Sequence, residues 1–255
     1  MYDKAILIAS FGTSCDETRE RNIGAVERAV AQRFLSHLCR RAFTSGMIRK
    51  KLQARGIAVH SVTEALHELS AAGVKTVTVL PTHLIYGEEY DKLCREVEMQ
   101  KTAFESVCVA KPLLASYEEI HAVLASIDGG IARAEDEALV LMGHGTEHPC
   151  NYIYAAMDYY AKDIGMRACF IGTVEAYPSI DTITAALKAG GWKRAVLAPL
   201  MLVAGDHAQN DMAGEEDSWL CRLRAEGIEA RAVLRGLGEY EAVRALYCAH
   251  AQEAL

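Results

Sequence analysis

The sequence predicts an α/β protein of two similar lobes, each a parallel sheet flanked by helices, with one active cleft between the lobes. Three observations support this. Short apolar runs alternate with longer amphipathic stretches, the alternation restarts after Asp128, and strand-end motifs of the first half recur in order in the second. We therefore expect an N-terminal lobe over residues 1–129 and a C-terminal lobe over residues 130–255.

The first half opens with a strand and a helix. The run Lys4–Ser10 is almost wholly apolar, as expected of a strand covered on both faces. Asp16–Phe34 has helical spacing, with Ile23, Val26 and Val30 on one side. The remaining elements expected here are strands at Thr76–Leu80 and Val107–Leu113 and helices at Thr63–Ala72 and Glu88–Phe104.

The second half repeats this alternation. Strands followed by helices indicate a parallel sheet with right-handed crossovers, and such sheets bind ligands on the loops that follow the strands. The expected strands are Ala138–Met142, Ala168–Ile171, Ala195–Leu200 and Ala230–Leu234, and the expected helices are Asn151–Ile164, Ile180–Ala189 and Glu239–Ala251.

Three pairs of segments carry the internal repeat. In each pair an apolar strand runs into a similar loop. The pairs are Leu7–Thr13 with Val140–Thr146, Phe43–Gly46 with Gly172–Glu175, and Thr78–Glu89 with Val196–His207. Their offsets of 133, about 129 and 118 residues fall steadily along the chain, as a duplication followed by deletions would produce.

Polar residues present in only one half are the candidates for chemistry. Phe11 is matched by His144, Gly46 approximately by Glu175, and Glu89 by His207. The second half thus holds a candidate metal site of two histidines and one carboxylate, which Glu89 could approach from the first half. Such ligands suit divalent Co, Ni, Fe or Zn, and three of them leave coordination positions open.

Each of these residues also has an ordinary structural explanation. A histidine after a strand can be a hydrogen-bonded loop residue, and a glutamate at a helix start is stabilised by the helix dipole. If the histidines are ligands, the acidic neighbours Glu147 and Asp206 are candidates to orient them.

Composition excludes several classes of protein. The net charge of −7 argues against a nucleic-acid binder, and no apolar run is long enough to span a membrane. The 8 cysteines include no CxxC pair, so we expect reduced thiols and, with no signal peptide in evidence, a cytoplasmic protein. The GxGxxG, GxxxxGK[ST] and GxSxG motifs are missing, which argues against nucleotide binding and against serine hydrolysis.

Charge is divided unequally between the halves. Residues 1–129 hold 16 basic and 16 acidic residues, whereas residues 130–255 hold 11 and 18, so the whole excess of acid lies with the candidate metal site. Basic residues at 40–41 and 49–51 bracket the Phe43–Gly46 loop. They suit a carboxylate-rich ligand, or they form a solvated helix face.

Together these motifs resemble the anaerobic cobalt chelatases, the class II sirohydrochlorin cobaltochelatases called CbiK. The resemblance covers nearly the whole chain. The segments that carry it are Ser10–Ser14, Ala42–Ile48, Gly143–Gly145, Val174–Pro178, Pro199–Met212 and Gly236–Glu239.

The resemblance implies a bilobal chelatase fold and insertion of Co²⁺ into sirohydrochlorin. It places the metal ligands at His144, Glu175 and His207, with His144 as proton acceptor and Glu89 as a second catalytic residue. Co²⁺ is then a substrate ion, and no organic cofactor is expected. The residues expected to bind the tetrapyrrole are Ser10, Phe11, Gly12, Thr13, Ser45, Gly46, Tyr86, Gly87, Met201, Leu202, Val203 and Ala204.

Several alternatives stay open from the sequence. The same ligands fit a chelatase for Fe²⁺ or Ni²⁺, because ligand type is a poor guide to the physiological metal. A non-catalytic carrier of metal or tetrapyrrole is the other alternative. The substrate is sirohydrochlorin or a close relative such as precorrin-2. No nucleic-acid or membrane partner is expected, and a homo-oligomer is possible.

Overall fold

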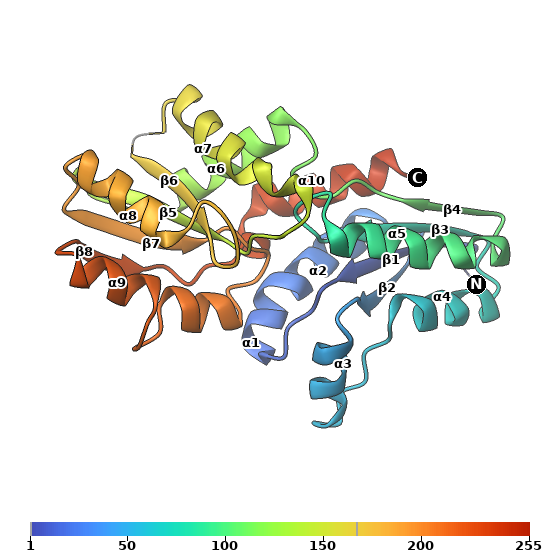
Figure 1. Ribbon diagram of the computed structural model, residues 1–255. Coiled ribbons are helices and arrows are strands. Elements are labelled where there is room, and N and C mark those ends of the chain that lie inside the picture. The colour runs from blue at the N-terminus through green and yellow to red at the C-terminus, as the bar shows by residue number, and fades with distance from the viewer. Residues whose placement is uncertain (1, 167) are drawn as a thin grey trace. The chain divides into compact units, whose positions relative to one another are not determined.

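Two four-stranded parallel sheets form the framework of the protein. The computed structural model describes residues 2–166 and 168–255. The strand orders are β2-β1-β3-β4 and β6-β5-β7-β8, so each sheet has the same topology with its first strand inside (Figure 1). Every strand pair within the sheets is parallel. The predicted fold class, two similar α/β lobes with parallel sheets, is confirmed.

The first sheet and its helices come mostly from the N-terminal half. Its strands are β1 (Lys4–Ser10), β2 (Leu38–Phe43), β3 (Thr76–Pro81) and β4 (Ser106–Val109). Its helices are α1 (Asp16–Thr18), the π-helical turn η1 (Arg19–Ile23), α2 (Gly24–Arg33), α3 (Gly46–Gln53), α4 (Val62–Ala71), α5 (Glu88–Gln100) and the short η2 (Lys101–Ala103).

The second sheet repeats the arrangement. Its strands are β5 (Glu137–Gly143), β6 (Cys169–Thr173), β7 (Arg194–Pro199) and β8 (Glu229–Ala232). The helices from residue 117 onward are α6 (Tyr117–Gly130), η3 (Pro149–Asn151), α7 (Tyr152–Asp163), α8 (Ile180–Ala189), the π-helical turn η4 (Ala208–Met212), α9 (Trp219–Ala225), η5 (Leu237–Glu239) and α10 (Glu241–Glu253).

Each sheet has an apolar core between one face and a pair of helices. In the first, alternate residues of β1 such as Leu7 pack with Leu66 of α4 and Leu93 of α5. In the second, Val140 of β5 packs with Ile183 of α8 and Trp219 of α9. These strands are buried on both faces, since their helical crossovers cover the sheet on either side.

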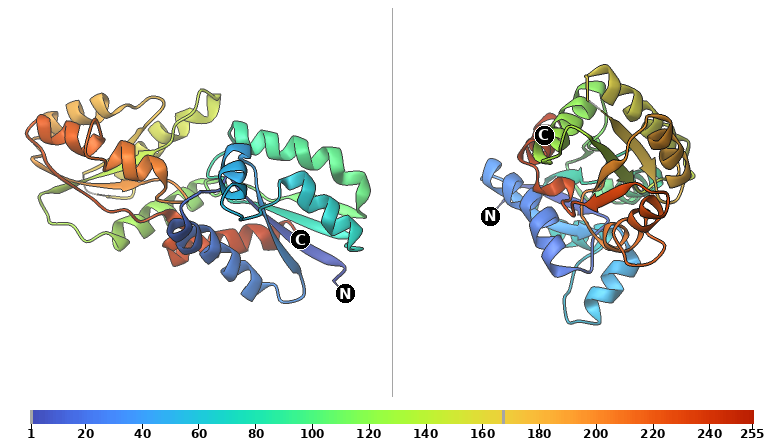
Figure 2. Two further views of the ribbon diagram at one scale, coloured as in Figure 1. Left: turned by 90° about the horizontal axis from the view of Figure 1, so that it is seen from below. Right: turned by 90° about the vertical axis from the view of Figure 1, so that its left-hand side faces the viewer.

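The chain divides into two compact units that do not coincide with the predicted halves. Unit 1 holds residues 1–115 and 241–255, and unit 2 holds residues 116–240. The boundary differs from the predicted 129/130 because the last helix of each half belongs to the other half's unit. Helix α6 packs against α7 in unit 2, whereas α10 packs against α2 and β3 in unit 1 (Figures 1 and 2).

Hydrogen bonds hold α10 in unit 1. The hydroxyl of the buried Tyr247 donates to the carbonyl of Thr82 at 2.8 Å, and the Thr78 hydroxyl of β3 donates to the carbonyl of Ala254 at 3.4 Å. The strand repeat revealed the duplication, but a strand pattern carries no information about which sheet a terminal helix covers.

Strand register confirms the repeat and corrects one of its pairings. Ser10 lies opposite Phe43, as Gly143 lies opposite Thr173, and the next backbone bonds run from Ser45 N to Phe11 O and from Glu175 N to His144 O. The counterpart of Glu175 is therefore Ser45, one residue before the predicted Gly46. The one-residue error arose because the two loops share almost no sequence.

In the described ranges, 2–166 and 168–255, no helix has both the length and the apolar character needed to cross a membrane. The cytoplasmic location stays a prediction.

Candidate metal centre

Three ligand-type side chains of unit 2 converge at the carboxyl end of its sheet. Ligand atoms of His144, Glu175 and His207 lie within 4.8 Å of one another. The Nδ1 atom of His144 is 3.6 Å from Oε2 of Glu175, and the two imidazole rings meet edge to face with centroids 4.7 Å apart. The sequence predicted these three residues as a set, and the structure brings them together.

His144 lies directly after β5, between Gly143 and Gly145, and the local backbone requires glycine at both positions. A Cβ on Gly143 would lie 2.3 Å from the ring of Tyr154, a buried residue of α7. Gly145 has φ +86°, which favours glycine, and its carbonyl oxygen is 2.9 Å from Nδ1 of His144. A carbonyl only accepts, so this contact is a hydrogen bond in the tautomer with its proton on Nδ1, which leaves Nε2 to bind a cation. This carbonyl, rather than the acidic neighbour Glu147, orients the ring.

Glu175 projects from the loop after β6, which folds closely onto the His144 turn. A Cβ on Gly145 would lie 2.9 Å from both the backbone nitrogen of Ala176 and Cβ of Thr173. The base of the loop is closed by the backbone bond from Thr173 N to Pro178 O at 2.6 Å. The two loops are therefore packed together through backbone atoms, and this packing fixes the position of the Glu175 backbone relative to His144.

His207 is oriented by a carboxylate one helical turn away. Its Nδ1 atom lies 2.7 Å from Oδ2 of Asp211, and this bond leaves Nε2 available for a metal. The predicted partner Asp206 is wrong, because its Oδ1 accepts from Nδ2 of Asn210 at 3.0 Å. The spacing of four residues on a helix was the available sequence signal for Asp211.

Glu89 lies in unit 1, at the start of α5, where its Oε2 accepts from the hydroxyl of Thr44 at 3.0 Å. It is the counterpart of His207 in the repeat, but its neighbours differ. The position matching His144 carries Phe11, and the position matching Glu175 carries Ser45. Glu89 thus lies at the strand ends of unit 1 without an imidazole at the position that matches His144 or a carboxylate at the position that matches Glu175.

The residues predicted to bind a tetrapyrrole differ in exposure. Phe11 and Tyr86 are 48% and 45% exposed at strand-end loops, as expected for side chains available to a flat ring. Ser10 and Ala204 are buried, and the hydroxyl of Ser10 accepts from the hydroxyl of Thr82 at 2.8 Å. Ser45 caps α3 by accepting from Ile48 N at 3.3 Å.

The other predicted tetrapyrrole residues lie on the same strand-end loops. Leu202 is buried, whereas Met201 and Val203 are partly exposed beside it. Thr13 and Gly87 are also buried, and Gly12 and Gly46 are partly exposed. Gly12 has φ +98° and a Cβ there would lie 2.5 Å from the ring of Phe43, so this glycine is required by the turn.

The basic residues at 40–41 and 49–51, which bracket the Phe43–Gly46 loop, are only partly paired with carboxylates of the protein. Arg41 binds the carboxylate of Glu27 through two nitrogens, so it serves the fold of unit 1. Arg49 of α3 lies 3.7 Å from Oε2 of Glu64, beyond hydrogen-bond distance, and its Nε is buried without a partner. Arg41 and Arg49 are therefore both paired with carboxylates of unit 1.

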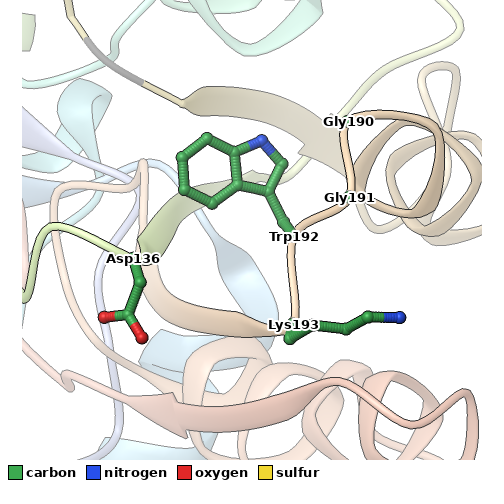
Figure 3. Close-up of a pocket in the computed structure, with 5 residues that line it drawn as sticks. All are labelled: Asp136, Gly190, Gly191, Trp192 and Lys193. Atoms are coloured by element: carbon green, nitrogen blue, oxygen red, sulfur yellow. The ribbon is translucent and has the colours of Figure 1, made fainter.

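A surface hollow lies at the opposite edge of the second sheet. Its lining residues are Asp136, Gly190, Gly191, Trp192 and Lys193 (Figure 3). Asp136 immediately precedes β5 and Lys193 immediately precedes β7, so the hollow is at the amino ends of the strands. The candidate metal site lies at their carboxyl ends, where α/β sheets bind ligands.

Comparisons with known proteins agree with this geometry. A family model described as "Cobalt chelatase (CbiK)" matches residues 4–255. The chain is 40% identical over 255 residues to a sirohydrochlorin cobaltochelatase of Salmonella typhimurium, covering 99% of this chain and 96% of that protein. It is 36% identical over 248 residues to the sirohydrochlorin cobaltochelatase CbiKC of Nitratidesulfovibrio vulgaris, covering 94% and 86%.

Solved structures support the fold. SirB from Bacillus subtilis with Fe³⁺ superposes with a TM-score of 0.68 at 14% identity, covering 99% of this chain and 95% of that one. CbiX, described as the terminal enzyme of siroheme biosynthesis in denitrifying bacteria, superposes with a TM-score of 0.54 at 17% identity, covering 98% and 99%.

Proposed function

The chain belongs to the CbiK family of cobalt chelatases, and from this we propose that His144, Glu175 and His207 hold the Co²⁺ that it inserts into sirohydrochlorin. The reaction exchanges two pyrrole N–H protons for the metal ion. It therefore needs a cation held loosely enough to leave and a base that takes the protons. The observation that carries the assignment is the convergence of the three ligand atoms within 4.8 Å.

The ligand set supports capture followed by release. Two imidazoles and one carboxylate suit Co²⁺, and three protein ligands leave positions for water or for a pyrrole nitrogen. The side chains are open to solvent, with 47% of His144, 54% of Glu175 and 37% of His207 exposed. A buried, closed site would favour retention of the ion, as in a carrier, so this exposure favours the enzyme.

His144 is the proposed proton acceptor. Its ring is fixed through Nδ1 by the carbonyl of Gly145, which leaves Nε2 to serve first as metal ligand and then as base. As the ion moves to the macrocycle, Nε2 becomes free at the moment when a pyrrole proton must be removed. His207 differs, because the Asp211 carboxylate favours its role as a ligand.

Unit 1 contributes the proposed second catalytic residue and part of the macrocycle surface. Glu89 is ordered by Thr44 and is a carboxylate that could take the other proton. Within unit 1, the exposed rings of Phe11 and Tyr86 supply apolar area suited to a flat tetrapyrrole.

An insertion assay tests this function and its residues together. Purified protein is mixed with sirohydrochlorin and Co²⁺, and formation of cobalt-sirohydrochlorin is followed by absorbance. We expect His144→Ala and His207→Ala each to lower the rate at least about 100-fold, since each removes a ligand and the first also removes the base. His67→Ala is the matched control, because this histidine of α4 is exposed and its Nε2 is hydrogen-bonded to Oε1 of Gln100 at 3.0 Å.

Two outcomes would contradict the proposal. Full rates in both ligand variants would exclude the site, and tight Co²⁺ binding without any rate above the spontaneous reaction would favour a carrier. Fe²⁺ and Ni²⁺ assayed beside Co²⁺ under identical conditions test the choice of metal.

A further inference from the structure

Asn151 joins the two loops that carry His144 and Glu175. Its Oδ1 accepts from the backbone N–H of Thr146 at 3.0 Å, and its Nδ2 donates to the carbonyl of Tyr177 at 2.7 Å. Thr146 is two residues after His144, and Tyr177 is two residues after Glu175. One side chain therefore connects both loops, and it bonds each loop two residues after the proposed ligand.

This link begins where the sheet ends. The β5–β6 register stops at Gly143 and Thr173, and two more backbone bonds follow, from Val174 N to Gly143 O at 3.0 Å and from Glu175 N to His144 O at 2.9 Å. Gly145 and Ala176, the next residues of the two loops, are still in close contact. Because Asn151 bonds to both loops past this point, it extends their connection to the outer side of the ligands.

The other half of the repeat has a different residue at this position. In both halves the threonine after the strand accepts a backbone bond two residues on, from Cys15 N to Thr13 Oγ1 and from His148 N to Thr146 Oγ1. This equivalence places Thr18 opposite Asn151. The Thr18 hydroxyl donates to the carbonyl of Cys15 within its own turn, so the bridging amide is present in the half that holds the metal cluster.

We propose that Asn151 is a positioning residue that fixes the separation of His144 and Glu175, so that the three-ligand set is formed before a divalent cation arrives. The inference rests on the proposed metal site. Asn151 is not itself a ligand, because both ends of its amide are bonded to backbone groups. Without this bridge the two loops would lose a connection beyond the Gly145–Ala176 contact, and freedom there would let the ligand atoms move apart.

Cobalt binding in the absence of tetrapyrrole is the direct test. Asn151→Ala removes both bonds, and Asn151→Leu removes them while keeping the size of the side chain. Co²⁺ is titrated into each protein and followed by its visible absorption, and thermal melting is recorded on the metal-free protein. We expect Co²⁺ affinity to fall about 10- to 100-fold in both variants, and KM for Co²⁺ to rise more than kcat falls.

The control is Thr18→Ala, which alters the equivalent position of unit 1 and should leave Co²⁺ affinity unchanged. Wild-type affinity in either Asn151 variant would overturn the inference, including the case in which only the melting temperature falls. Failure of both variants to fold would also overturn it, by making the bridge a requirement of the fold. His207→Ala is titrated in parallel: if it binds Co²⁺ like the wild type, the proposed metal site itself is wrong.

Discussion

His83 is a polar side chain at a position where the second half of the repeat carries an apolar one. Leu113 N bonds to the carbonyl of His83 as Leu237 N bonds to that of Met201, so these two residues are equivalent. Both ring nitrogens of His83 are buried without a hydrogen-bond partner among residues 2–166 and 168–255. Burial lowers the pKa of His83 from 6.5 to about 4, and the carboxylate of Glu89 opposes this only in part.

This buried imidazole should make the protein less stable as the pH falls from 6.5 toward 4. In that range the unfolded chain takes up a proton at His83 that the folded chain refuses, so acid favours unfolding. The cost is fully present below pH 4 and absent well above pH 6.5. With a folded pKa of about 4, His83 alone should lower the free energy of unfolding by about 2 kcal/mol between pH 7 and pH 5.

His83→Met installs the counterpart residue and isolates this effect. We expect urea unfolding of the variant to lose about 2 kcal/mol less stability than the wild type between pH 7 and pH 5. Titrating groups that do not interact with His83 cancel in the comparison. His121→Met, which replaces an exposed histidine of α6, is the control and should keep the wild-type pH dependence. An identical loss in the His83 variant would contradict the prediction.

At the same scale, sequence reasoning found the proposed metal ligands but not the residues that orient them. His144, Glu175 and His207 were detectable because each differs in type from its counterpart in the other half. Asp211 and Asn151 act through contacts that depend on geometry: one helical turn for Asp211, and the approach of two loops for Asn151. A difference between repeats identifies a residue, but it does not show which neighbour orients it.

Among the elements, the turn after β5 has the strictest backbone requirement near the site. Gly145 combines φ +86° with close contacts to the Glu175 loop on the side where a Cβ would lie. Gly191, at the end of α8, has a similar φ of +73° but open space around it. Comparing substitutions at these two glycines therefore separates the cost of the left-handed backbone conformation from the cost of the steric contact that a Cβ would make.

Gly145→Ala should therefore be the more damaging substitution. Gly191→Ala bears only the left-handed strain, about 1–2 kcal/mol of unfolding free energy. Gly145→Ala adds a steric clash with Ala176, so we expect a loss of about 3 kcal/mol or more and Co²⁺ binding at least about 10-fold weaker. Thermal melting and Co²⁺ titration measure the two effects. Equal Co²⁺ affinity in the two variants would show that the Gly145 contact does not position Glu175.

Secondary structure was predictable where burial produced a clear pattern. The run Lys4–Ser10 and the segment Ile180–Ala189 match β1 and α8 in both bounds. No bounds were predicted for strand β2, because its middle residues are Arg40 and Arg41, which lie at a less buried edge of the sheet. Helices α3, α6 and α9 were also missed. The predicted helix Asp16–Phe34 is interrupted by a π-helical turn, which apolar spacing does not distinguish from α-helix.

On the scale of the whole molecule, the duplication and the compact units follow different boundaries. Backbone bonds from Leu114 N to Leu84 O and from Gly238 N to Leu202 O show that the ends of both repeats are equivalent, so α6 and α10 are counterparts. Yet α6 belongs to unit 2 and α10 to unit 1. Each repeat therefore provides the terminal helix for the other unit, which no strand pattern could have predicted.

This exchange predicts which fragment of the chain can fold alone. Residues 116–240 contain the second sheet, α6 with its Ser116 cap, and all three proposed ligands. Residues 130–255, the half defined by the repeat, lack α6 and carry α10 without the unit 1 surface that it covers.

We expect the 116–240 fragment to melt cooperatively and to bind Co²⁺ within about 10-fold of the full chain, since its ligands and loop contacts are retained. The second fragment should aggregate or lack a cooperative transition, because the face left bare by α6 and the apolar side of α10 are both exposed. Circular dichroism melting and Co²⁺ titration of the two fragments decide between the two boundaries. A stable 130–255 fragment together with an unfolded 116–240 fragment would show that the repeat, and not the compact unit, is the folding unit.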